Sequence, residues 1–212
     1  MKSEKIALHL DNTKFIHVMI LFFTAISANE QGQTQVIIIA GTDRGTKTSS
    51  VAYDPTGKTS CMVNDVKGPA RIGSQATGDT GQTLESNIFP LLCGGCNGTC
   101  EMDSNEVPKN VLNSCLKLTS DGTWIPNKKD MLENRVDFSM NIFNNTAISI
   151  GGRDGVNKYG TNTIESFDFV SQIWYLLPNI PVRIYGHCSV IYNQALLIIM
   201  GGVQNGKVNV NF

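Results

Sequence analysis

The sequence repeats one pattern about every 50 residues. In each repeat an apolar run of strand length ends in glycine: VIIIAG at Gly41, FPLLCGG at Gly95, AISIGG at Gly152 and LLIIMGG at Gly202. Glycine after a buried strand lets the backbone take a positive φ or approach a neighbouring strand closely. A period of this length is typical of folds that stack one supersecondary unit on the next. The sequence therefore predicts a repeat architecture.

The best-preserved repeat has the pattern of four antiparallel strands. Arg135 opens a strand that continues to Ile142, Asn144 and Asn145 make a hairpin turn, and residues 146–150 return to a glycine pair. A polar loop, RDGVNKYGTN, then leads to TIESFDF, a two-residue turn and QIWYLLP. Four antiparallel strands per repeat make up one propeller blade. The predicted fold class is therefore all-β.

Three kinds of residue recur at matching positions of the repeat. Glycine pairs end the second strand, tryptophan lies in the fourth strand, and arginine precedes the first strand. Tryptophan is a large apolar plate that can fill the wedge between adjacent sheets, and arginine can donate several hydrogen bonds across the same junction. We expect structural roles for these residues: Gly94, Gly95, Gly151, Gly152, Gly201, Gly202, Trp124, Trp174, Arg71, Arg135 and Arg183.

The segment 135–202 resembles the kelch repeat, with GG, TIESFDF, Trp174, LPNIPVRIYGH and the next GG in order. The resemblance extends weakly back to residue 35, and the first repeat departs from it, with a single Gly41 and no tryptophan. LLCGG followed by SCLKL and GTW is similar to the cysteine-bearing kelch repeats of secreted invertebrate proteins. The resemblance implies a kelch-type β-propeller with about three to four blades of four antiparallel strands. Kelch propellers usually close with about five to seven blades, so an incomplete ring is expected, beginning at the second strand of a blade.

The N-terminus has the layout of a secretory signal peptide. Three lysines precede the apolar run FIHVMILFFTAI at 15–26, and the small residues Ala25 and Ser27 suit cleavage before Ala28. We predict that residues 1–28 are a signal peptide and that residues 29–212 are a partial propeller that is secreted. An uncleaved signal anchor and a buried core segment are the alternatives.

Six cysteines follow the leader, which indicates disulfides in an exported chain. Cys93 ends one strand and Cys115 lies in the next, so an antiparallel hairpin would place them within disulfide distance. Cys96 and Cys100 would then pair within the loop, while Cys61 is the alternative partner of Cys93. A metal site at the clustered thiols would need a fourth ligand. Two cysteines in different repeats receive no partner and would be free buried thiols: Cys61 and Cys188.

Two sequons agree with export. Asn97 lies in NGT and Asn144 in NNT, and both fall in segments with the composition of loops or turns. Such asparagines are accepted as glycosylation sites in secreted proteins. We predict glycosylation at Asn144 and also at Asn97.

The composition excludes some partners and leaves a binding module as the first hypothesis. Seventeen basic and 18 acidic residues give a net charge of −1, which provides no attraction for nucleic acid or for an anionic membrane after signal cleavage. Propellers carry variable loops at the ends of a rigid ring, and the candidate loops here are 94–110 and 153–162. We expect an unknown protein or glycan ligand, and self-association through open blade edges.

Two other functions compete with this hypothesis. The resemblance extends to galactose oxidase, whose copper site needs two histidines and two tyrosines. His9 and His17 lie in the leader, so only His187 remains, where a structural role is expected. A G-x-S-x-G elbow is also absent, and we predict a chain without catalytic activity or cofactor. An intracellular kelch substrate adaptor would carry a helical oligomerisation domain where this sequence has its apolar leader.

Overall fold

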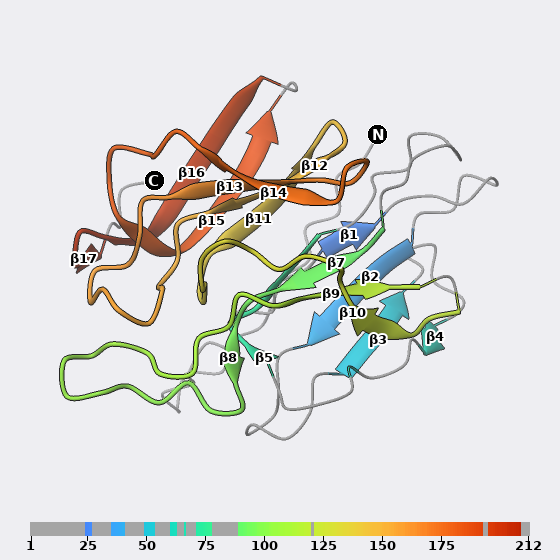
Figure 1. Ribbon diagram of the computed structural model, residues 1–212, viewed down its shortest axis with the longest axis horizontal. Helices are drawn as coiled ribbons and strands as arrows, with labels where there is room; N and C mark the ends of the chain where they lie inside the picture. Colours follow the sequence, from blue (N-terminus) through green and yellow to red (C-terminus); the bar gives the residue numbers. More distant parts are fainter. Residues whose placement is uncertain are drawn as a thin grey trace, which may run out of the picture.

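The computed structural model of the chain is built of strands, which are arranged in successive antiparallel sheets (Figure 1). Among the described residues, no helix is long and apolar enough to cross a membrane. The structure describes the backbone of residues 24–26, 35–40, 49–53 and 60–62, and both backbone and side chains of residues 66, 71–77, 89–119, 121–192 and 195–208.

The first sheet has the strand order β1-β2-β3-β4. Its strands are β1 (Thr24–Ile26), β2 (Gln35–Ala40), β3 (Ser49–Tyr53) and β4 (Ser60–Met62). The sequence predicts that the chain enters at the second strand of a blade, and this is wrong for the structure, in which β1 pairs antiparallel with β2. β1 lies within residues 1–28, the predicted signal peptide, whose other residues are outside the described part; the signal peptide stays a prediction.

The next two sheets are the four-stranded units that the repeat predicts. The second contains β6 (Gln75–Thr77), β7 (Leu91–Cys93), β9 (Cys115–Leu118) and β10 (Trp124–Pro126), with the short pair β5 (Arg71–Ile72) and β8 (Cys96–Asn97) beside it. The third contains β11 (Ser139–Phe143), β12 (Thr146–Ile150), β13 (Ile164–Asp168) and β14 (Ile173–Leu177). The fourth has three described strands, β15 (Ile184–Tyr192), β16 (Leu196–Gln204) and β17 (Lys207–Val208).

The first strands of the four sheets line up in chain order. β1 contacts β6, β6 contacts β11, and β11 contacts β15. The sheets therefore follow one another as blades in an arc, with the first sheet at one end and the fourth at the other (Figure 1). The predicted all-β, propeller-type architecture is confirmed.

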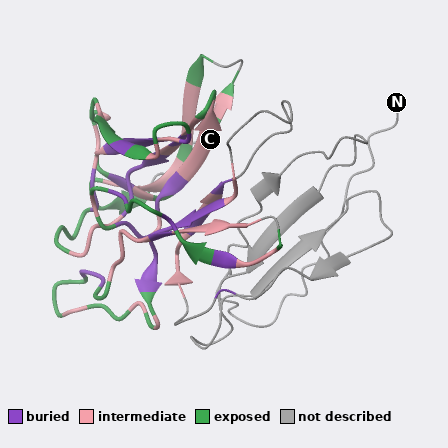
Figure 2. Ribbon diagram, turned by 45° about the vertical axis from the view of Figure 1, so that its right-hand side comes forward, coloured by how far each residue is buried: buried purple, intermediate pink, exposed green. Residues whose placement is uncertain are grey.

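The main core lies between the second and third sheets, where the buried residues concentrate (Figure 2). Three core residues lie side by side across the third sheet. In the strand register Ala147 pairs with Phe167, and Phe167 pairs with Trp174. They pack against the second sheet at Leu91 and Cys93. Trp174 is almost fully buried and its ring centroid lies 5.2 Å from that of Phe167. Trp174 thus fills the wedge between two blades, as its recurrence predicts.

Trp124 takes the matching place one blade earlier. It is buried with Leu92 and Val66 in a second, smaller cluster. The two tryptophans therefore have the same role in successive blades, which explains why they recur in the sequence at the same phase of the repeat.

Candidate functional site

The glycine pairs bring the backbones of neighbouring blades together. Gly94 and Gly151 have φ values of +65° and +58°. A Cβ atom on Gly94 would lie 2.4 Å from the carbonyl oxygen of Arg135, and one on Gly151 would lie 2.5 Å from that of Ile184. Both carbonyls belong to the segment that enters the next blade, so a side chain at either glycine would separate the blades.

The second glycine of each pair completes the junction. The Gly95 N–H donates to the carbonyl of Arg135 at 2.8 Å, and the Gly152 N–H donates to that of Ile184 at 2.8 Å. These hydrogen bonds satisfy polar groups at the crossing between blades. In the fourth sheet, Gly201 and Gly202 have similar φ values of +69° and +80°.

Two recurring arginines have matching hydrogen-bond partners. Arg71 donates to the carbonyl oxygens of Gly94 and Ser114, and Arg135 donates to those of Gly151 and Thr163. Each also donates to the hydroxyl of that serine or threonine. The sequence predicts hydrogen bonds across the junction between sheets. The side chains instead turn back into their own blade, where each reaches one carbonyl just after the second strand and one just before the third.

Arg135 also holds a fully buried carboxylate that the repeat pattern does not predict. Its Nη2 lies 2.8 Å from Oε1 of Glu165, and neither side chain is exposed. Glu165 further accepts hydrogen bonds from the backbone N–H groups of Leu132 and Glu133. The pair therefore fixes the segment that joins the second blade to the third. A charged residue inside the apolar strand TIESFDF was the available signal.

Arg183 differs from the other two arginines. It is exposed, and it donates to the carbonyl of Gly160 in the preceding loop at 2.8 Å. In the described part of the fourth blade there is no third strand of full length to provide the usual acceptors.

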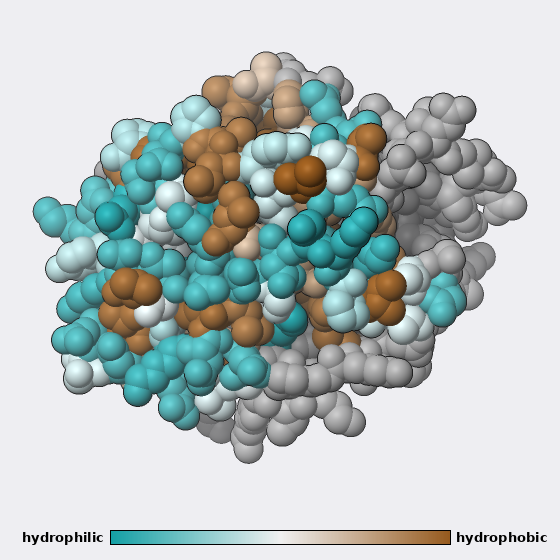
Figure 3. All heavy atoms as spheres, viewed as in Figure 1, coloured by the Kyte–Doolittle hydropathy of each residue, from teal (hydrophilic) through white to brown (hydrophobic). Residues whose placement is uncertain are grey.

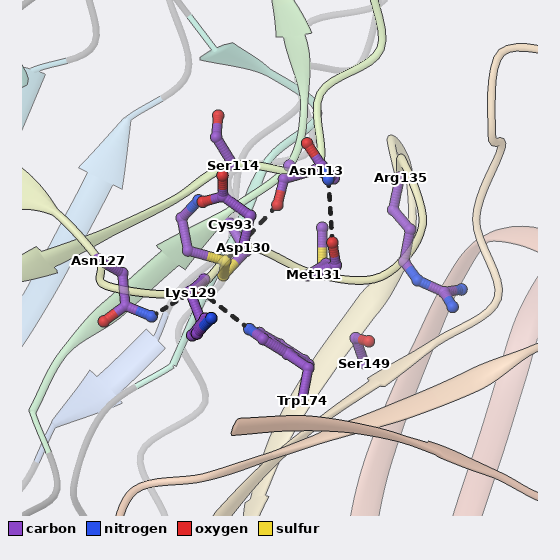
Figure 4. Close-up of a disulfide and its surroundings, with 12 residues drawn as sticks. Cys93, Asn113, Ser114, Asn127, Lys129, Asp130, Met131, Arg135, Ser149 and Trp174 are labelled. Atoms are coloured by element: carbon purple, nitrogen blue, oxygen red, sulfur yellow. Dashed lines mark hydrogen bonds between the residues drawn. A yellow bond between two sulfur atoms is a disulfide. The ribbon is translucent and has the colours of Figure 1, made fainter. Parts of the chain in front are cut away.

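The two disulfides join the cysteine pairs that the sequence predicts. Cys93 and Cys115 are opposite each other in the pairing of β7 with β9, with their Cα atoms 4.1 Å apart. The bond lies beside the segment 127–131, whose Lys129 carbonyl accepts from the indole N–H of Trp174 (Figure 4). Cys96 and Cys100 are bonded with Cα atoms 5.2 Å apart.

Cys188 has a free thiol and is exposed, so the expectation of a buried thiol is wrong for this residue. The side chain of Cys61 is outside the described part. Asn97 is exposed in β8, and Asn144 is exposed at the β11–β12 turn with a φ of +52°.

The candidate binding loops lie against each other and enclose a pocket of about 410 Å³. The segment after β8 lines it with Asp103, Val107 and Lys109, and the segment after β12 lines it with Asp154 and Val156. The sequence predicts both loops, but not the pocket between them. This pocket is the candidate functional site.

Direct contacts brace the two loops. Nζ of Lys158 lies 3.0 Å from Oε2 of Glu106, and this hydrogen bond raises the pKa of Lys158. Nη1 of Arg153 lies 3.5 Å from the sulfur of Met102. Arg153 also forms an ion pair with Asp137 and stacks over the ring of Tyr185. The loops are therefore tied to each other and to the strands below them.

The pocket has a carboxylate on each side and apolar side chains at its rim. A backbone hydrogen bond from Val107 is the main cause that lowers the pKa of Asp103. Burial raises the pKa of Asp154, but hydrogen bonds from the backbone N–H groups of Asn157 and Val156 bring it below its ordinary value. Both side chains are thus anionic at neutral pH. Val156 is 77% exposed beside them.

His187 lies away from this pocket, in the junction between β11 and β15. It is 2% exposed, and its Nε2 lies 2.8 Å from Oγ of Ser139. Burial lowers its pKa to about 4. Within the described part of the chain, no three histidine, cysteine or acidic residues are grouped closely enough to hold a metal ion. His187 is thus buried between the third and fourth blades.

Comparison with known proteins identifies the repeat. The family model for the kelch motif matches residues 134–181. The Kelch repeat and BTB domain-containing protein 2 of horsepox virus is 31% identical over 75 residues, which are 35% of this chain and 13% of the viral protein. Its counterpart from cowpox virus strain Brighton Red is 32% identical over 71 residues, 34% of this chain and 12% of the viral protein.

A solved structure supports the fold over a longer part of the chain. The kelch propeller YjhT aligns with a TM-score of 0.54 at 14% identity, over 82% of this chain and 56% of the YjhT chain. The chain therefore spans a little over half of the propeller that it resembles and a small part of the viral relatives.

Proposed function

We propose that this chain, which is a kelch-repeat protein, is an exported binding module without enzymatic activity that holds a protein or glycan in the pocket between the segments after β8 and β12. The observation that carries the proposal is the bracing of the two loops. A rigid scaffold that presents preorganised loops is the usual arrangement of a binding site, because little ordering cost remains on association.

The chemistry of the pocket favours a partner with a basic or hydrogen-bond-donating group flanked by an apolar side chain. Asp103 and Asp154 outnumber the one lining cation, Lys109, and provide anionic acceptors, and Val156 provides exposed apolar surface. A lysine or arginine of a protein partner meets these requirements, and so do sugar hydroxyls next to the apolar face of a sugar ring.

Export is supported by the predicted signal peptide, the two disulfides and the exposed sequon asparagines. The proposal also includes self-association through open strand edges of the blades. The similarity to viral Kelch repeat and BTB domain-containing proteins favours a second candidate, an intracellular adaptor, in which the four bonded cysteines would be reduced thiols.

A photo-crosslinking amino acid placed at Val156 tests the proposal. Val170 is the control position, because it is also an exposed valine, 64% exposed, but lies in the turn between β13 and β14. We expect a crosslinked protein or glycan from the secretion medium at Val156 and none at Val170. Equal capture at both positions, or no capture at either, would contradict a binding site at the pocket.

A further inference from the structure

The wall of the pocket that follows β8 is an irregular hairpin of two antiparallel arms. At its base, the Asn97 N–H donates to the carbonyl of Asn110 at 2.9 Å. At the next residue of the second arm, the Lys109 N–H donates to the carbonyl of Glu101 at 2.8 Å. Residues 98–100 therefore form a bulge on the first arm, with no counterpart on the second.

The disulfide between Cys96 and Cys100 closes this bulge. Cys96 pairs with Val111 at the base of the hairpin, and Cys100 is the last residue of the bulge. Strand register is weakly specified where both faces are polar, and the segment NGTCEMDSNE is largely polar. The disulfide therefore determines where the outer part of the hairpin begins.

The outer part of the hairpin, residues 101–109, forms the pocket wall and its bracing. Its pocket-lining residues include Asp103, Val107 and Lys109. Glu106, in the same part, forms the ion pair with Lys158 of the facing loop. A displacement of the outer part would thus remove one side of the pocket.

The contacts that hold the outer part against the facing loop are mainly exposed. The side chains of Lys158 and Glu106 are 47% and 76% exposed, and an ion pair with such exposure contributes little stability. Met102 is 45% exposed, and Val107 provides one buried apolar side chain. The surface at the lower left of Figure 3, where the hairpin lies in Figure 1, is mostly hydrophilic. We therefore expect the position of the outer part to depend on the disulfide.

The same disulfide is the more accessible of the two. Cys93, Cys96 and Cys115 are at most 1% exposed, whereas Cys100 is partly exposed. The thiolate of a dithiol reductant can therefore attack Sγ of Cys100, and the sulfur of Cys96 leaves as a thiolate that takes up a proton. The second thiolate of the reductant then displaces Cys100. The dithiol becomes a disulfide, and its two electrons remain on the two cysteine thiols.

We propose that the Cys96–Cys100 disulfide is a redox switch for the pocket. The oxidised chain keeps the outer part of the hairpin in place, and reduction by a dithiol releases it and weakens binding. The inference rests on the proposed function of the pocket and adds the condition under which the pocket binds. An exported chain would have the formed pocket, whereas an intracellular chain with reduced thiols would lack it.

Hydrogen exchange measured by mass spectrometry tests the switch without a partner. We expect residues 101–109 to exchange about tenfold faster or more in Cys96→Ala/Cys100→Ala than in the native chain. The matched control Cys93→Ala/Cys115→Ala opens the other disulfide and should leave this segment within about twofold of the native rate. Circular dichroism checks that both variants are folded. Unchanged exchange in the first variant, or an equal increase in the control, would overturn the proposal.

Thiol mapping of the native chain gives a second measurement that needs no variant. After the free thiols are blocked, limiting dithiothreitol and a second alkylating reagent should label Cys96 and Cys100 about tenfold faster than Cys93 and Cys115. Faster labelling of Cys93 and Cys115 would contradict the assignment of the switch to the hairpin.

Photo-crosslinking at Val156 connects the switch to binding. We expect the oxidised native chain to capture its partner, and Cys96→Ala/Cys100→Ala to capture about tenfold less. Equal capture by the two proteins would overturn the switch but leave the binding site standing. No capture by the native chain would instead contradict the proposed function itself.

Discussion

The buried ion pair of Arg135 and Glu165 shows how one residue of the repeat serves two blades. The guanidinium ties together the ends of two strands in its own blade, while its carboxylate partner accepts from the segment that arrives from the preceding blade. Removing one member of such a pair leaves the other charge buried without compensation. Arg71 and Arg135 therefore have the same role at matching positions, because each ties the end of the second strand to the start of the third in its own blade.

We expect Arg135→Met to lower the free energy of unfolding by about 3–5 kcal/mol, because it leaves Glu165 buried and unpaired. Arg183→Met should change it by less than about 0.5 kcal/mol, because Arg183 is exposed. Urea denaturation measures both. The double variant with Glu165→Gln should recover part of the loss, and equal losses for the two arginines would contradict the assigned role.

The pH dependence of stability should report His187. Burial lowers its pKa to about 4, while the unfolded chain has a histidine pKa of about 6.5. Between these two pH values the unfolded chain binds a proton at His187 that the folded protein does not bind. The contribution of His187 to the free energy of unfolding is therefore fully present above about pH 6.5 and is lost as the pH falls toward 4. His187→Gln should remove this part of the pH dependence in thermal unfolding curves. An unchanged pH profile would place His187 in contact with solvent.

At the scale of elements, the sequence predicted what depends on local pattern. The glycine-terminated strands, the hairpin at Asn144 and the facing positions of Cys93 and Cys115 follow from period-2 alternation and turn chemistry. Other features depend on segments that are far apart in the chain. These are the buried carboxylate of Glu165, the contact of Lys158 with Glu106 and the open space at Gly201. Single-sequence patterns contain no information on such contacts, which is why the loops were predicted and the pocket was not.

The two disulfides should contribute unequally. Replacing Cys93 and Cys115 by alanine opens a loop with a sequence separation of 22, whereas Cys96 and Cys100 are separated by 4. Chain-entropy arguments give losses of roughly 3 and roughly 2 kcal/mol. Guanidinium denaturation of the two double variants compares them. A larger loss from the Cys96 and Cys100 variant would mean that the β7–β9 register is not maintained by its disulfide.

At the scale of the whole molecule, β1 belongs both to the first blade and to the predicted signal peptide. β1 lies within the residues that a signal peptidase would remove, so an exported chain keeps three strands of the first sheet and an uncleaved chain keeps four. The identity of the mature N-terminus therefore decides both the compartment and the form of the first blade.

We expect the protein from a eukaryotic secretory host to begin at Ala28 or Asn29 and to carry glycan at Asn144. N-terminal sequencing and glycosidase treatment of the native chain and of Asn144→Gln measure this. A product that retains Met1, stays in the cells and shows no mobility shift would favour the intracellular adaptor.

The dissociation constant of the partner captured at the pocket tests the central claim most directly. Val156→Arg places a bulky cation at the rim beside Asp103 and Asp154, and it should weaken binding at least tenfold, or about 1.4 kcal/mol. Val170→Arg adds the same charge in the turn between β13 and β14 and should leave the constant within about twofold. Equal effects of the two substitutions would show that the partner binds elsewhere and that the braced loops are not its site.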